Sequence, residues 1–318
     1  MHVYRKKKRQ IEWRAVNFFI SYSEEAIILT DFETAAVIGG DSRQIYCAEK
    51  LRTAGFKTYL FGFGLSTDNS ALGKTDDLAK AMSAGIIVLP LPVTKNGKLL
   101  NAPFCDREIP LTEIAELVTP EKKVFYGMGT KQFERILADK GCEYRDYYKF
   151  ESLIIKNALL TAEGVLGIIT DKIPKTVFGM KIAITGYGRV GYFTAKILKA
   201  LGASVTVFAR SPEQLAKAEC AGLETEELQF FGCEKRSFDC LINTVPAPVI
   251  GEDELNMLQP DALLIETASA PYGIDFEKAK SKGFVLIKAF SLPGKTSPVS
   301  AGEVIAESII THLSGGAV

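Results

Sequence analysis

Residues 181–210 read KIAITGYGRVGYFTAKILKALGASVTVFAR, and this stretch decides the fold class of half of the chain. The β-formers at 182–185 lead directly into the glycine motif GYGRVG at 186–191. A helical pattern follows, and then a second β-rich run at 204–209. Strand, helix and strand in this order form a βαβ unit. The spacing therefore predicts a dinucleotide-binding Rossmann domain.

The three glycines of the motif have separate roles in such a unit. Gly186 permits the tight turn out of the strand, Gly188 lets the backbone approach a pyrophosphate, and Gly191 lets helix and strand pack closely. The unpaired amides at the start of the helix then bind phosphate. The whole motif is a candidate cofactor contact, namely Gly186, Tyr187, Gly188, Arg189, Val190 and Gly191.

The end of the second strand indicates which nucleotide binds. Enzymes that prefer NAD usually carry Asp or Glu there, whereas this chain has Arg210 and Ser211, a cation and a hydroxyl suited to a 2′-phosphate. The prediction is NADP(H), and the alternative is a solvated charge at a strand end. A nicotinamide ribose commonly lies beside the residues after a later strand, here Thr244, Val245 and Pro246, which otherwise form a plain turn.

Length and composition limit the classes of function. A chain of 318 residues favours two domains. With 38 basic and 38 acidic residues and no basic block beyond the first ten, nothing indicates a nucleic-acid partner, and the substrate should be small. The six cysteines form no CxxC pair, which is typical of a reduced cytoplasmic protein without a metal site.

The βα rhythm begins at residue 34 and gives the domain boundaries. Residues 1–33 are interpreted as an extension that is neither an export signal nor a membrane span. Expected strands at 35–38, 57–61, 85–89 and 123–126 form a substrate or partner domain over 34–150. Residues 151–175 connect it to the nucleotide domain at 176–298. Within this connection we expect a strand at 152–157 and a helix at 161–169 that is capped by Thr161.

The predicted fold is α/β, with two Rossmann-like doubly wound domains. Further strands of the second domain are expected at 238–243, 263–267 and 284–287. The final helix, within 299–318, follows a completed sheet, so it should return and pack on the first domain.

The scarcity of histidine restricts the chemistry. Hydroxyacid dehydrogenases, which this layout suggests first, usually need a histidine acid–base group beside the nicotinamide. The chain has only His2, in the basic tail, and His312, in the last helix. A carboxylate, a lysine, a hydroxyl or a partner must act instead, or the hydride transfer must be driven by the stability gained by the substrate.

Several loops together resemble the A-type subunit of dipicolinate synthase. They are GGDSRQ (39–44), LPLPVTKNG (89–97), NALLTAEG (157–164), GYGRVG (186–191), ARS (209–211), INTVPAPVI (242–250) and SLPGKTSPVSAG (291–302). The resemblance runs from residue 34 to the end. It implies an NADP-dependent oxidoreductase that works with a smaller, flavoprotein-like B-type subunit of dipicolinate synthase. The family makes dipicolinic acid from the dihydrodipicolinate branch of lysine biosynthesis, in the mother cell of spore-forming bacteria. The chain departs from the family at Leu160 and at 270–272.

The residue inventory suits oxidation of a cyclic dicarboxylate. Aromatisation of the substrate ring is thermodynamically favourable, so hydride transfer requires only that the enzyme orient the substrate and provide a modest base. Candidate substrate contacts are the cations and polar groups of the loops, Arg43, Gln44, Thr94, Lys295 and Ser297, although each could be a surface ion pair or turn group instead. Asp41 and Glu163 are the candidate bases, with a helix cap and a helix-dipole partner as the alternatives.

Two other functions stay open. One is a different NADP-linked oxidoreductase of the hydroxyacid or alanine dehydrogenase layout, which the missing histidine disfavours. The other is a nucleotide-binding regulatory subunit whose partner performs the chemistry. A homo-oligomer is compatible with each of these functions.

Overall fold

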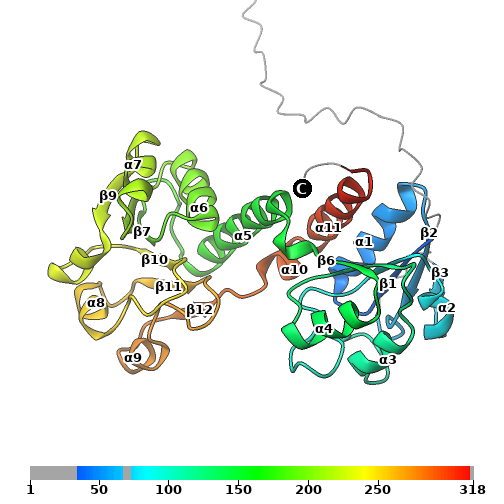
Figure 1. The fold of residues 1–318 in the computed structure, drawn as a ribbon. Coiled ribbons are helices and arrows are strands. Elements are labelled where there is room, and N and C mark those ends of the chain that lie inside the picture. Colours follow the sequence, from blue (N-terminus) through cyan, green and yellow to red (C-terminus); the bar gives the residue numbers. More distant parts are fainter. Residues whose placement is uncertain (1–33, 67–72, 316–318) are drawn as a thin grey trace, which may run out of the picture.

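The computed structural model describes residues 34–66 and 73–315. Figure 1 shows two α/β domains with the long helix α5 (Glu151–Lys172) running between them. The extension predicted at residues 1–33 lies outside the described residues, as do the last three residues of the chain.

The first domain is built on a parallel sheet of six strands in the order β3-β2-β1-β4-β5-β6. Its strands are β1 (Thr34–Ile38), β2 (Lys57–Phe61), β3 (Gly73–Thr75), β4 (Ile86–Val88), β5 (Lys123–Tyr126) and β6 (Glu143–Asp146). Its helices are α1 (Ser42–Thr53), α2 (Leu78–Met82), α3 (Leu111–Glu116) and α4 (Lys131–Asp139), and a 3-10 turn covers Tyr147–Lys149. Along β1, Ala35 and Val37 enter one hydrophobic cluster while Ala36 and Ile38 enter another. Both faces of this sheet are therefore buried, as parallel sheets require.

The second domain repeats this plan with the order β12-β11-β10-β7-β8-β9, again all parallel. Its strands are β7 (Lys181–Thr185), β8 (Ser204–Ala209), β9 (Glu224–Glu227), β10 (Cys240–Asn243), β11 (Leu263–Glu266) and β12 (Leu286–Lys288). Its helices are α6 (Arg189–Ala200), α7 (Pro212–Cys220), α8 (Glu252–Met257) and α9 (Phe276–Ser281), with a 3-10 segment at Leu228–Cys233. The prediction of two doubly wound domains is confirmed.

The strand order reverses beside β1 in the first sheet and beside β7 in the second. Ligands of open α/β sheets bind outside the carboxyl ends of the strands at such reversals. The loops that leave β1 and β7, which carry the GGDSRQ and GYGRVG motifs, therefore lie where a ligand is expected.

The connection between the domains was predicted only in part, because residues 161–169 are helical as expected but the helix begins earlier. Residues 152–157 are not a strand, because one helix, α5, spans Glu151–Lys172. Thr161 caps nothing: it lies inside α5, and its hydroxyl donates to the Asn157 carbonyl at 2.8 Å. The apolar, partly β-branched run at 153–155 suggested a strand, and Gly164 and Gly167 obscured a helical burial pattern that continues through Val165 and Ile169.

Helix α5 has the length and apolar composition of a membrane-spanning helix, which among the described helices is true of it alone. Its position is that of an internal helix, because Val165 and Ile169 belong to the hydrophobic core of the second domain. Gly164 faces Leu292, and a Cβ atom there would lie 3.0 Å from the Leu292 Cβ. The apolar character of α5 is thus explained by packing within the protein.

The last helix, α11 (Pro298–Leu313), returns to the first domain and packs beside α1, as predicted, and Figure 1 shows the two helices side by side. The short helix α10 (Leu292–Thr296) precedes it. Gly302 lies at the crossing, where a Cβ atom would collide with the carbonyl oxygen of Arg43. Only glycine lets the two backbones come this close.

Substituting this glycine tests the crossing. Gly302→Ala is expected to lower the free energy of unfolding by about 1–3 kcal/mol, because the clash with backbone outweighs the gain in helix propensity. Gly167→Ala in α5 is the control, because no atom in the described part of the chain lies within 4 Å of its added methyl group. That variant should gain about 0.5–1 kcal/mol. Urea unfolding of both variants measures the difference in the free energy of unfolding. An equal change in the two variants would show that the helix crossing tolerates a side chain.

Candidate active site

A cavity of about 710 Å³ lies between the two domains. The first-domain side and the helices next to it contribute Arg43, Leu91, Met128, Tyr148, Asn157 and Pro293, among others. The second domain contributes Gly188, Arg189, Val190, Thr244, Pro246 and the loop after β11. Both predicted loop motifs, 39–44 and 186–191, thus have residues on one cavity, which is large enough for a small molecule beside the reactive end of a dinucleotide.

The glycine motif has the geometry that a dinucleotide needs. Gly186 has φ +86°, and a Cβ there would lie 2.6 Å from the Thr244 hydroxyl oxygen. A Cβ at Gly191 would collide with the carbonyl oxygen of Gly186. At Gly188, by contrast, an added Cβ would have no atom of the described residues within 4 Å, and none of their side chains caps the start of α6. The first-turn amides of a helix have no partner inside it, and the open space at Gly188 beside them suits a pyrophosphate.

The start of α7 supports the same loop. Arg210 is exposed at the end of β8, and the Ser211 hydroxyl accepts a hydrogen bond from the Gln214 backbone at 3.4 Å. The Gln214 side-chain oxygen in turn accepts the backbone N–H of Tyr187 at 3.3 Å. Gln214 was not predicted, because a glutamine in the first turn of a helix has no distinctive signal in a sequence.

Arg189 joins the glycine motif to α5. Its guanidinium donates to both carboxylate oxygens of Glu151, at 2.8 and 2.7 Å. Both side chains are about half exposed, so the pair adds little to stability. Its consequence is local, because it holds a cation at the rim of the cavity.

A buried polar chain connects the carboxyl ends of three strands below the cofactor loops. The Thr185 hydroxyl donates to the Asn243 side chain at 2.6 Å, and the Asn243 amide donates to Glu266 Oε1 at 2.7 Å. Glu266 is fully buried and also accepts backbone N–H groups from Ala268, Gly273 and Ile274 at 2.8–2.9 Å. Four N–H donors thus compensate one buried carboxylate. This chain of contacts fixes the 267–274 loop, which lines the cavity.

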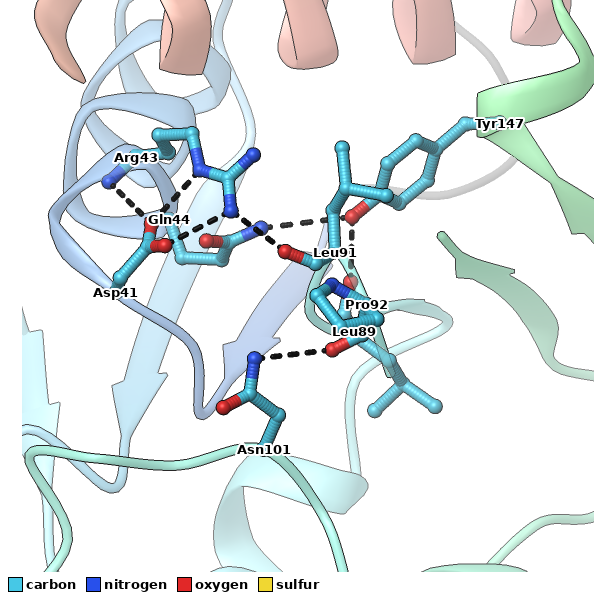
Figure 2. A network of polar contacts seen from close by, with 8 residues as sticks. All are labelled: Asp41, Arg43, Gln44, Leu89, Leu91, Pro92, Asn101 and Tyr147. Carbon is cyan, nitrogen blue, oxygen red and sulfur yellow. Dashed lines mark hydrogen bonds and ion pairs between the residues drawn. The ribbon is translucent and has the colours of Figure 1, made fainter. Parts of the chain in front are cut away.

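Arg43 is the buried cation of the cavity wall, only 6% exposed. Its Nε and Nη2 donate to the two oxygens of Asp41 at 2.9 and 2.8 Å, and Nη2 also donates to the carbonyl of Leu91 (Figure 2). Although burial alone would lower the pKa of the guanidinium, the hydrogen bonds and charge of Asp41 raise it. Nη1 makes no hydrogen bond to the described part of the chain, so it is available to a ligand.

The neighbouring residues in Figure 2 hold the loop after β4 in place. The hydroxyl of the fully buried Tyr147 accepts from the Gln44 amide at 3.4 Å and donates to the Leu89 carbonyl at 2.9 Å. The Asn101 amide donates to the Pro92 carbonyl at 3.1 Å. Leu91 and Pro92 are therefore fixed where they line the cavity.

The other predicted substrate contacts lie off the cavity wall. Thr94 is buried and accepts the backbone N–H of Gly97 at 3.0 Å, which closes a turn. Lys295 is exposed and Ser297 precedes α11, while Leu292 and Pro293 of the same segment line the cavity. Gln44 is buried beside Tyr147.

Neither predicted base lines the cavity. Asp41 caps α1, accepting the Arg43 backbone N–H at 3.1 Å, and it binds the Arg43 side chain. Glu163 is exposed in the middle of α5, so it is not in a first helical turn. Among the described residues, the ionisable side chains that line the cavity are Arg43, Arg189, Tyr148 and Tyr272, with no carboxylate.

Both domains of the chain are similar to known proteins. Residues 34–148 match the family model of the N-terminal domain of the dipicolinate synthase A-type subunit. Residues 168–272 match that of the NAD binding domain of D-isomer specific 2-hydroxyacid dehydrogenases. The A-type dipicolinate synthase subunit of Bacillus subtilis (strain 168) is 31% identical over 286 residues, which covers 88% of this chain and 95% of that protein. The chain belongs to the family of dipicolinate synthase A-type subunits.

Solved structures agree with membership of the dipicolinate synthase family. The crystal structure of the dipicolinate synthase A chain from Bacillus subtilis superimposes with a TM-score of 0.80 at 28% identity, covering 91% of this chain and 98% of that one. A transhydrogenase from Sinorhizobium meliloti, 14% identical with a TM-score of 0.63 over 87% of this chain and 92% of that one, shares the fold. The chain is an oxidoreductase with a domain for a nicotinamide dinucleotide.

Proposed function

We propose that the chain is the NADP-dependent A-type subunit of a dipicolinate synthase, which oxidises a dihydrodipicolinate to dipicolinic acid. The observation that carries the proposal is the cavity itself. It joins a dinucleotide loop to a wall with a buried arginine, and the described residues that line it include two arginines and no carboxylate. Such a lining suits a small dianion beside a cofactor with phosphates.

In this proposal the residues of the chain mainly bind and orient. Arg43 Nη1 binds one substrate carboxylate, and the loop held by Glu266 positions the ring against the cofactor. Bound NADP would supply the hydride acceptor. Aromatisation also releases one proton, and water can take it, because the product is far more stable than the substrate. Since Asp41 and Glu163 do not line the cavity, we propose neither as the base. We assign Gln44, Thr94 and Ser297 to supporting the walls, and no role to the exposed Lys295.

The histidine-dependent alternative receives no support from the described residues. The His312 ring stacks on Phe150 at 5.2 Å and meets Phe125 edge-on at 5.8 Å, away from the cavity lining. Among the described residues, no histidine is therefore placed to act as an acid–base group beside the nicotinamide. The match to the 2-hydroxyacid dehydrogenase model concerns the nucleotide domain, residues 168–272, and not the substrate wall.

The preference for NADP is proposed to depend on Arg210. Arg210→Asp should lower the ratio of NADP to NAD affinity by about tenfold or more, because a charged hydrogen bond to the 2′-phosphate is lost and repulsion replaces it. Fluorescence titration with NADPH and NADH measures the ratio. Lys131→Asp makes the same change of charge at an exposed residue of the first domain and should leave the ratio unchanged. An unchanged ratio in Arg210→Asp would remove the argument for NADP.

The reaction is tested with the purified chain, freshly made dihydrodipicolinate precursor and NADP. The family name implies a complex, so we propose a partner, the flavoprotein-like B-type subunit of dipicolinate synthase, in the cytoplasm of the mother cell of a spore-forming bacterium. The mixture is therefore assayed with and without a candidate for this partner. NADPH and dipicolinate forming in equal amounts would establish the reaction and show whether the partner is required. If neither forms in either mixture while NADPH binds, the proposed substrate is wrong.

A further inference from the structure

Tyr148 lines the cavity, and the proposed function assigns it no role. The residue is partly buried. Its backbone N–H is bound, but its hydroxyl makes no hydrogen bond to the described part of the chain. A tyrosine hydroxyl can both donate and accept, so one without a protein partner is available to a ligand.

The backbone around Tyr148 is fixed on both sides. Asp146 Oδ1 accepts the backbone N–H of Tyr148 at 3.0 Å and that of Met128 at 3.1 Å, and both donors belong to cavity-lining residues. The preceding Tyr147 is fully buried and donates to Leu89. The 3-10 turn thus sends one tyrosine into the core and leaves the next at the cavity, in a position that no loop motion has to create.

Arg43 lies close enough to Tyr148 for the two groups to influence each other. Burial raises the pKa of the Tyr148 hydroxyl, and the positive charge of Arg43 opposes part of that rise. The hydroxyl therefore stays protonated at neutral pH and is a donor. Arg43 uses Nε and Nη2 for Asp41 and Leu91, which leaves Nη1 without a hydrogen bond to the described part of the chain.

We infer that the Tyr148 hydroxyl and Arg43 Nη1 bind the same carboxylate of the substrate, one donor to each of its oxygens. This rests on the proposed function, since it requires a carboxylate ligand. Tyr148 is then a positioning residue: it fixes the rotation of the carboxylate, and with it the face that the ring presents to the nicotinamide. A carboxylate offers about four acceptor sites, so one neutral and one charged donor can share it.

The probe is pyridine-2,6-dicarboxylate, titrated calorimetrically into the full chain saturated with NADPH. Tyr148→Phe is expected to weaken its binding by about tenfold, the effect of one hydrogen bond to a charged group, and to raise KM for the substrate similarly with little change in kcat. Tyr144→Phe is the control, because Tyr144 lies on β6 and does not line the cavity. NADPH affinity should be the same in all three proteins.

A double-mutant cycle with Arg43→Lys asks whether the two donors share one carboxylate. Sharing predicts that Tyr148→Phe costs clearly less in the Arg43→Lys background than in the wild-type chain. If the two effects simply multiply, or if Tyr148→Phe binds the probe as tightly as the wild-type chain, the shared-carboxylate inference is wrong while the proposed function stands. If the wild-type chain binds NADPH but not the probe, both are wrong.

Discussion

Glu266→Gln is expected to lower the free energy of unfolding by about 2–6 kcal/mol and to weaken NADPH binding with it. Oε1 accepts Asn243 and Ala268, while Oε2 accepts Gly273 and Ile274. An amide keeps one acceptor oxygen and directs an NH₂ group at the other pair of donors. Two buried N–H groups then lose their acceptor, and each costs about 1–3 kcal/mol.

The loss should reach function because of what the carboxylate holds. The 267–274 segment forms much of the second-domain wall, and Asn243 precedes the predicted cofactor residues Thr244 to Pro246. Urea unfolding gives the stability, and fluorescence titration gives the NADPH affinity of the folded variant. Glu277→Gln is the matched control, because Glu277 is exposed in the first turn of α9, and it should cost less than about 0.5 kcal/mol. If Glu266→Gln is as stable as this control, the carboxylate does not organise the loop.

The fold was predictable wherever local signals agreed with the tertiary structure. The glycine motif between two β-rich runs is one such signal. The strands at 35–38 and 123–126 are another, because helices cover both faces of each sheet and the strands are therefore mostly apolar. Strands β6 and β9 were missed because they lie at sheet edges, where EYRD and ETEE carry the charges that protect an edge.

The candidate site was predictable only in part. Arg43 and the glycine motif follow strands at the positions where the strand order reverses, and a sequence places such residues well. Lys295 lies only two residues beyond Pro293, but Ser291 precedes α10 with φ +56°, and the helical turn that follows leaves Lys295 exposed. No pattern in RDYYKF distinguishes Tyr147, in the core, from Tyr148, on the cavity, because that depends on a 3-10 turn. The sequence around Glu266 resembles that of any acidic residue at a strand end. Its burial could not be predicted, because it depends on backbone amides of the loop that follows.

Arg43→Lys is expected to reduce kcat/KM for the proposed substrate by about 100-fold, or about 2.7 kcal/mol, even though the charge is kept. A guanidinium can bind both oxygens of Asp41, the Leu91 carbonyl and a ligand at once, because its donors point in fixed directions. The ammonium group of a lysine is a single charged centre, so it can bind either Asp41 or the substrate well, but not both. The planar guanidinium also packs closely against α10. A Cβ atom at Gly294 would lie 2.9 Å from Arg43 Nε, so the α10 backbone is in direct contact with the Arg43 side chain.

The measurement is the initial rate of NADPH formation against substrate concentration, beside a titration of NADPH affinity. Arg145→Lys provides the control, because Arg145 is half exposed on the edge strand β6 and should change the rate by less than about twofold. The fall in Arg43→Lys should appear mainly in KM, since the carboxylate is bound in the ground state as well as in the transition state. If Arg43→Lys keeps the rate and KM of the wild-type chain, the guanidinium serves only to join α1, the Leu91 loop and α10. The dicarboxylate must then bind elsewhere in the cavity, with Arg189 as the other arginine on its lining.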